Sequence, residues 1–203
     1  MGFFQNTCKP QGLGGKMMVN IMNNGHAKLS EWGFSHVDVP ADANVLDVGC
    51  GGGANIAVWL TRCPNGIVTG LDYSEVSVSE SIKYNKKAIQ EKRCQILQGN
   101  VAQMPFDDNS FDYISAFETI YFWPGLERCF KEVNRVLKPH AKFIIVVEVD
   151  GTKEKDKKWS DIVEGMVIYK ENELVANLET AGFTNIRTDH NEKQQMCVIA
   201  EKK

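Results

Sequence analysis

The sequence predicts an α/β fold, in which a mostly parallel sheet of seven strands is covered by helices on both faces and completed by a C-terminal antiparallel hairpin. Strand-like and helix-like segments alternate from residue 44 onward, which is the pattern of a doubly wound sheet. Residues 142–149 are almost all apolar, as expected of a parallel strand buried on both faces. With 203 residues and 43% hydrophobic content, the chain can bury such a core as one compact domain.

The order of the elements follows from residue type and spacing. Residues 45–48 are β-branched and apolar and predict the first strand, and the apolar spacing over 54–62 predicts the helix after it. The rhythm then repeats, with strands at 67–71, 95–97, 111–117 and 142–149 and helices at 75–91 and 126–137. Helices near 159–166 and at 171–180, the second ended by Gly182, precede short strands at 184–189 and 195–201. The polar linker 190–193 between these two strands predicts a hairpin.

Two regions depart from this alternation. Residues 1–40 contain a glycine-rich stretch followed by helix-compatible segments at 16–23 and 26–32, so we expect an N-terminal helical cap ahead of a domain at 41–203. The mixed charge run at 150–158 is typical of a solvated loop or the start of a helix.

Composition excludes several classes of function. The 23 basic and 26 acidic residues give a net charge of -3, so nucleic acid and membrane surfaces are not expected partners. No apolar run approaches the roughly 20 residues that span a bilayer, and no signal-peptide core is present, which predicts residence in the cytoplasm. The six cysteines form no Cys-x-x-Cys pair and predict reduced thiols and no metal. The sequence leaves open a monomer or a homodimer.

A glycine-rich loop lies directly between the first strand and the first helix of the sheet. Its spacing, Gly49-x-Gly51-x-x-Ala54, fits a dinucleotide-binding loop, and Asp72 follows at the end of the next strand. The spacing alone is therefore ambiguous. Charge is more informative, because Asp47 would repel a pyrophosphate and no lysine or arginine occurs between residues 45 and 61. A cationic ligand without phosphate, such as S-adenosylmethionine, suits this loop better.

Several stretches together resemble the class I S-adenosylmethionine-dependent methyltransferases, which have a Rossmann-like fold, and in particular the ubiquinone and menaquinone C-methyltransferases. The resemblance covers about residues 40–200. It rests on residues 46–53 (LDVGCGGG), 70–74 (GLDYS), 99–106 (GNVAQMPF), 110–112 (SFD) and 135–139 (RVLKP). Two departures stand out: Asn100 replaces a common acidic residue, and His140-Ala141 replace two glycines.

The resemblance implies S-adenosyl-L-methionine as cofactor and assigns residues to its parts. Asp47 would hold the ammonium group, and Asp72 would accept hydrogen bonds from the ribose hydroxyls. Tyr73, Asn100 and Val101 would meet the adenine, with Met104 packed against it. The glycine-loop backbone would pass under the methionine and ribose, which adds Gly49, Cys50, Gly51 and Gly53, and Phe117 completes the predicted cofactor-binding set.

The catalytic candidates follow the fourth and fifth strands, where a doubly wound sheet places its reactive space. Glu118 and Tyr121 come after the fourth strand, and Glu148 belongs to the end of the fifth. A carboxylate there can act as a general base if the methyl acceptor loses a proton. No Asn/Asp-Pro-Pro-Tyr/Phe signature of base or peptide nitrogen methylation occurs. We therefore expect a small-molecule acceptor and in-line methyl transfer.

Two other functions fit parts of the sequence. A non-catalytic regulatory protein that binds S-adenosylmethionine would carry the same loop, since the catalytic residues follow no specific pattern. An oxidoreductase of the NAD type shares the glycine spacing, but Asp47 and the terminal hairpin argue against it.

Overall fold

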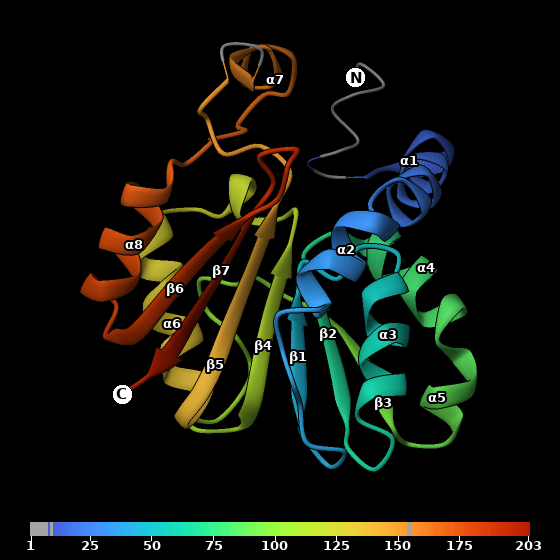
Figure 1. The fold of residues 1–203 in the computed structure, drawn as a ribbon. Coiled ribbons are helices and arrows are strands. Elements are labelled where there is room, and N and C mark those ends of the chain that lie inside the picture. Colours follow the sequence, from blue (N-terminus) through green and yellow to red (C-terminus); the bar gives the residue numbers. More distant parts are fainter. Residues whose placement is uncertain (1–7, 9, 154–155) are drawn as a thin grey trace. The chain divides into compact units, whose positions relative to one another are not determined.

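The computed structural model describes residues 8, 10–153 and 156–203. Its contacts divide the chain into two compact units, Met1–Asn100 and Val101–Lys203. Figure 1 labels the elements of both units.

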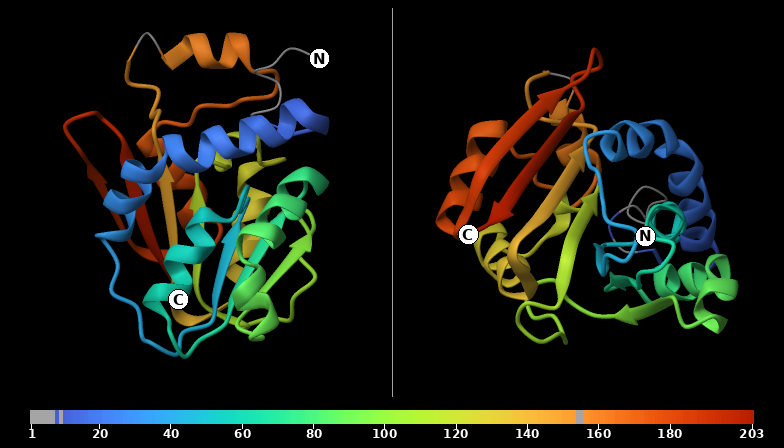
Figure 2. Two further views of the ribbon diagram at one scale, coloured as in Figure 1. Left: turned by 90° about the vertical axis from the view of Figure 1, so that its right-hand side faces the viewer. Right: turned by 60° about the horizontal axis from the view of Figure 1, so that its bottom comes forward.

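The first unit is a three-stranded parallel sheet with its helices. The strand order is β3-β2-β1, and the elements are α1 (Gly12–Gly25), α2 (Ala27–Phe34), β1 (Val45–Val48), α3 (Ala54–Arg62), β2 (Val68–Asp72), α4 (Glu75–Tyr84), α5 (Lys86–Gln90) and β3 (Cys94–Gln98). Every residue of β1 and β2 is buried, as expected of inner parallel strands. Helices α1 and α2 occupy the region expected to form the cap, while the cap boundary at residue 40 stays a prediction. Figure 2 shows the same elements from two further sides.

The helix expected over residues 75–91 is two helices, and the prediction of one continuous helix is wrong. Ser74 begins α4, because its hydroxyl accepts the backbone N–H of Ser77 at 3.3 Å. Asn85 ends α4, and its side-chain amide donates to the carbonyls of Gly53 at 3.0 Å and Ser81 at 3.1 Å. Asparagine favours such local side-chain bonds over helix continuation, so α5 starts afresh after it.

The second unit is a four-stranded mixed sheet with helices. The strand order is β4-β5-β7-β6, and the elements are β4 (Phe111–Phe117), the short 3-10 helix η2 (Ile120–Phe122), α6 (Leu126–Val136), β5 (Leu137–Val147), α7 (Lys157–Ile162), α8 (Glu171–Thr180), β6 (Phe183–His190) and β7 (Met196–Lys202). Strands β4 and β5 are parallel, and β7 pairs antiparallel with both β5 and β6. The predicted fold class, with seven strands and a C-terminal antiparallel hairpin, is confirmed.

Two elements of the second unit, β5 and α7, have other boundaries than the sequence predicts. Strand β5 begins at Leu137, which pairs with Phe111, and ends at Val147, so Glu148 and Val149 lie beyond the strand rather than in it. The pairing is irregular between Phe111 and Tyr113, and His140 within β5 adopts a left-handed φ of 64°. Helix α7 ends at Ile162 because Val163 is extended (φ -107°, ψ 107°) and buried, which shortens the helix expected near 159–166.

Among the described residues, no helix combines the length and the apolar character needed to cross a bilayer. The six cysteines all lie in the described part of the chain as thiols, and only Cys8 is not buried. The prediction of reduced cysteines is consistent with this arrangement.

Candidate functional site

The glycine loop leaves β1 as a tight turn that only glycine adopts without strain. Gly49, Gly51 and Gly53 have φ values of 73°, 51° and 81°. The N–H groups of Gly49 and Cys50 both donate to the Leu71 carbonyl of β2, at 2.7 and 3.2 Å. Gly53 then begins α3 as its N-terminal cap residue. The loop backbone is therefore fixed by its neighbours before any ligand arrives.

Gly51 and Gly52 of this loop differ in how closely other atoms approach them. A Cβ placed on Gly51 would meet nothing within 4 Å, so the backbone there borders open space. A Cβ on Gly52 would lie 2.6 Å from a Val19 methyl carbon and would also clash with the Asn23 side-chain amide, both on α1. Sequence analysis gave Gly52 no role, yet α1 packs directly on it. Gly51 is thus the part of the loop that a ligand can approach.

Asp72 is the acidic group closest to the open side of the loop. It is 7% exposed, and its two carboxylate oxygens accept the N–H groups of Gly51 and Ser74, each at 2.9 Å. Burial raises its pKa, and these two backbone N–H groups act in the opposite direction by stabilising the charged form. The Ser77 hydroxyl also bonds this carboxylate. A carboxylate has about four acceptor sites, so these three donors leave one for a ligand hydroxyl.

The surroundings of the loop are negatively charged. Asp47 on β1 is 2% exposed. Burial raises the pKa of the Cys50 thiol, and the charges of Asp72 and Asp47 raise it further, which places both carboxylates close to the loop. With no lysine or arginine between residues 45 and 61, this part of the first unit favours a cation over a phosphate.

The N-terminal segment contacts the end of β2. The Tyr73 hydroxyl donates to the Cys8 carbonyl, and the Ser74 hydroxyl donates to the Pro10 carbonyl at 3.0 Å. Tyr73 nevertheless remains 40% exposed. Its own carbonyl accepts the Gln98 side-chain amide of β3 at 3.1 Å, which ties the ends of β2 and β3 together. Two residues later, the predicted Asn100 is exposed.

In the second unit, the three predicted catalytic residues come together at the ends of β4 and β5. The Tyr121 hydroxyl lies 3.0 Å from a Glu118 carboxylate oxygen, and the Glu148 backbone N–H donates to the same oxygen. The Val149 N–H donates to the Tyr121 hydroxyl at 3.1 Å. Glu148 itself is exposed, and its carboxylate accepts the Gln195 side-chain amide at 3.4 Å.

Glu118 combines an unusual backbone with an unusual proton affinity. Its φ is 58°, a left-handed value that a residue with a side chain rarely adopts. Burial raises the pKa of Glu118 to about 8, and the charge of Glu148 adds to the rise, while the bonds from the Glu148 N–H and Tyr121 oppose it. A carboxyl group of this pKa can accept or release a proton near neutral pH.

The remaining predicted cofactor residues in the second unit are apolar and buried. Phe117 directly precedes Glu118 and is 9% exposed, and Val101 is 7% exposed. Met104, close after Val101, is 4% exposed. Beyond these, sequence analysis missed Asn85, whose amide supports Gly53, and the α1 side chains on Gly52. Only the run of three consecutive glycines gave a signal at Gly52, and no local pattern marked Asn85.

Comparison with known proteins points to one family. Residues 46–145 match the family described as a methyltransferase domain. The 24-methylenesterol C-methyltransferase 2 of Arabidopsis thaliana is 33% identical over 132 residues, which is 64% of this chain and 36% of that enzyme. The demethylmenaquinone methyltransferase of Bacillus cereus is 37% identical over 109 residues, or 53% of this chain and 46% of that one. The matched region thus spans less than half of either relative.

A solved structure extends the likeness to nearly the whole chain. The SAM-dependent methyltransferase from Aquifex aeolicus superposes with a TM-score of 0.75 at 21% identity, over 92% of this chain and 97% of that one. At this identity the similarity establishes the fold, including the sheet with its terminal hairpin.

Proposed function

Because the chain belongs to the class I S-adenosylmethionine-dependent methyltransferases, we propose that it transfers a methyl group from S-adenosyl-L-methionine to a small-molecule acceptor. The observation that carries this proposal is the glycine loop. Its open backbone at Gly51 adjoins the buried carboxylate of Asp72, and residues 45–61 around the loop include no lysine or arginine.

The residues of the first unit fit this cofactor in charge and hydrogen bonding. We assign Asp47 to the ammonium group and the loop backbone of Gly49, Cys50, Gly51 and Gly53 to the methionine and ribose portions. Asp72 would accept the ribose hydroxyls. Tyr73 and Asn100, followed by Val101 and Phe117 of the second unit, would contact the adenosine. A dinucleotide fits less well, since its pyrophosphate would face Asp47 without a compensating cation.

The acceptor is proposed to be an apolar small molecule methylated at carbon. The support is that the relatives carry the names of sterol and menaquinone-precursor methyltransferases. When bound, the cofactor supplies a methyl group on a positively charged sulfur with a good neutral leaving group. The chain therefore contributes alignment and exclusion of water, which can provide about 7–11 kcal/mol of the barrier reduction.

Glu118 is the proposed general base for an acceptor that loses a proton. Its pKa of about 8 lies near the pH at which a base works efficiently. The Tyr121 hydroxyl donates to one carboxylate oxygen of Glu118, and the Glu148 backbone N–H donates to the same oxygen. The Val149 backbone N–H donates to the Tyr121 hydroxyl. We assign Glu148 a supporting role in catalysis, because its exposed carboxylate raises the pKa of Glu118.

Calorimetry with purified protein tests the cofactor. We expect S-adenosylhomocysteine to bind and NAD⁺ not to bind. The Asp72→Ala variant should lose about 1–3 kcal/mol of binding free energy, because it removes hydrogen bonds to a charged group. Tight binding of NAD⁺ with no heat from S-adenosylhomocysteine would overturn the assignment, and an unchanged affinity in Asp72→Ala would remove that residue from the site.

Turnover of radiolabelled S-adenosylmethionine on a panel of sterols, quinols and phenols tests the reaction. We expect label in the organic phase for at least one apolar acceptor. Cofactor binding without turnover on any member of the panel would instead favour a regulatory protein that binds the cofactor.

A further inference from the structure

The segment between β3 and β4 holds its shape without a helix or a strand of its own. Its backbone N–H and carbonyl groups therefore need partners outside a regular ladder. Val101 and Met104 of this segment are nonetheless buried, at 7% and 4% exposure. Something must fix the segment from outside.

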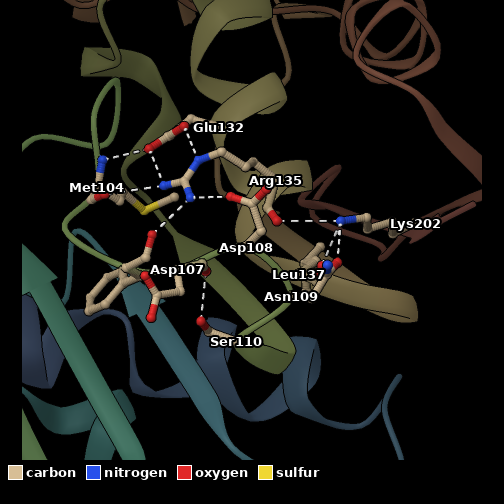
Figure 3. Close-up of polar contacts among 10 residues, drawn as sticks. Met104, Asp107, Asp108, Asn109, Ser110, Glu132, Arg135, Leu137 and Lys202 are labelled. Atoms are coloured by element: carbon tan, nitrogen blue, oxygen red, sulfur yellow. Dashed lines mark hydrogen bonds and ion pairs between the residues drawn. The ribbon is translucent and has the colours of Figure 1, made fainter.

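Arg135 on α6 provides that fixation (Figure 3). Its Nη1 donates to the Phe106 carbonyl at 2.8 Å and to Asp108 at 2.6 Å, and its Nη2 reaches the Met104 carbonyl at 3.2 Å. The Nε and Nη2 groups also form a two-point pair with the Glu132 carboxylate, at 2.8 Å each. These contacts occupy all five N–H donors of a guanidinium.

Glu132 completes the connection from the other side. Its Oε1 accepts the Met104 backbone N–H at 2.7 Å, so both polar backbone groups of Met104 are bound by this ion pair (Figure 3). Arg135 lowers the pKa of Glu132, and Glu132 with Asp108 raises the pKa of Arg135. The pair therefore stays charged throughout the neutral range. A lysine could not replace Arg135, because an ammonium group lacks the planar two-point geometry of a guanidinium.

The Arg135–Glu132 pair, called the clamp below, joins two stretches of which only Met104 was given a role, against the adenine. Met104-Pro105-Phe106 and the Arg135-Val136-Leu137-Lys138-Pro139 stretch both contribute to the family resemblance. None of their charged side chains belongs to the proposed catalytic or cofactor-binding groups. Their contacts explain why these residue types occur together.

We propose that Arg135 and Glu132 are positioning residues for adenine recognition. By fixing Met104 they set the position of the backbone from Val101 to Met104 within the second unit, and the proposed function assigns Val101 to the adenine. This inference rests on that function. It assigns no contact between the clamp and the cofactor, and it leaves the methionine and ribose groups to the glycine loop.

Binding of two ligands that differ only in the base tests the proposal. Dissociation constants are measured for S-adenosylhomocysteine and for S-inosylhomocysteine, in which the adenine amino group is replaced by oxygen. In Arg135→Lys we expect about tenfold weaker binding of S-adenosylhomocysteine, from loss of charge-assisted bonds. The dissociation constant of S-inosylhomocysteine divided by that of S-adenosylhomocysteine should fall toward one. Glu132→Gln, which keeps an oxygen for the Met104 N–H but loses the ion pair, should change the ratio in the same direction.

Lys202→Gln is the matched control. Lys202 bonds the Asn109 side chain at 2.8 Å and the Leu137 carbonyl at 2.7 Å, next to the clamp but on the side away from Met104 (Figure 3). We expect it to lower thermal stability without changing the ratio of the two constants. An unchanged ratio in a folded Arg135→Lys, with normal binding by the parent protein, would overturn the clamp alone. Failure of the parent to bind S-adenosylhomocysteine would overturn the clamp and the proposed function together.

Discussion

Glu118 has both a strained backbone conformation and a buried carboxyl group. A left-handed φ on a residue with a side chain costs about 1–3 kcal/mol, and burial of its carboxyl group adds to the cost. Such strain persists only where surrounding contacts impose it, and here Tyr121 and the Glu148 N–H hold the carboxylate. The position is therefore a strong candidate for a functional requirement rather than a packing one.

The pH dependence of the reaction should report this carboxyl group. With an acceptor that loses a proton, we expect kcat/KM to rise with pH and to level off above about 8, because the base acts only when ionised. Glu118→Gln should remove this rise and lower kcat by about 100- to 10,000-fold. Tyr121→Phe removes a bond that stabilises the ionised form, so the rise should move to higher pH. A pH profile that is the same in Glu118→Gln and the parent would exclude Glu118 as the base.

At the scale of elements, helix α1 packs directly on the glycine loop. The middle glycine of the loop has no room for a side chain because Val19 and Asn23 lie against it. Asn85, between α4 and α5, supports the same loop from another side through Gly53. The loop conformation thus depends on α1 and on the residue that joins α4 to α5.

Gly52→Ala tests this packing. We expect the added methyl group to destabilise the protein by about 1–3 kcal/mol, as overpacking does, and to speed hydrogen exchange in α1. Gly25→Ala is the control, because a Cβ there meets nothing within 4 Å. It should be neutral or stabilise the protein by about 0.5–1 kcal/mol. Equal effects of the two substitutions would show that α1 does not press on the loop.

Local patterns predicted some elements residue for residue and others poorly. Helices α3 and α8 and strand β4 begin and end where expected, since each has a clear apolar period and flanking turn residues. The break at Asn85 and the early start of β5 depend on partners far along the chain, namely Gly53 and Phe111. The same holds for the site. Residue types predicted roles for Asp72 and Glu118, whereas the Arg135 clamp and the crowding at Gly52 exist only in the folded chain.

At the scale of the whole molecule, cofactor binding should appear as a gain in stability. A ligand that binds only the folded state at a hundred times its dissociation constant adds about 2.7 kcal/mol to the free energy of unfolding. For a chain of this size that corresponds to a rise of about 5–10 °C in Tm. We expect this shift with S-adenosylhomocysteine and none with NAD⁺ at the same concentration, measured by differential scanning calorimetry. A larger rise in Tm with NAD⁺ than with S-adenosylhomocysteine would contradict the proposed cofactor.

The bonds from Tyr73 and Ser74 to the backbone at Cys8 and Pro10 have a thermodynamic consequence. Tyr73 is both a proposed neighbour of the adenosine and a donor to the Cys8 carbonyl, so the free energy of cofactor binding is coupled to that of this contact. The coupling is reciprocal: the factor by which these contacts change the affinity for the cofactor equals the factor by which the bound cofactor changes the equilibrium of the contacts. Substitutions in the first two dozen residues, away from the cofactor, would therefore change the dissociation constant of the cofactor.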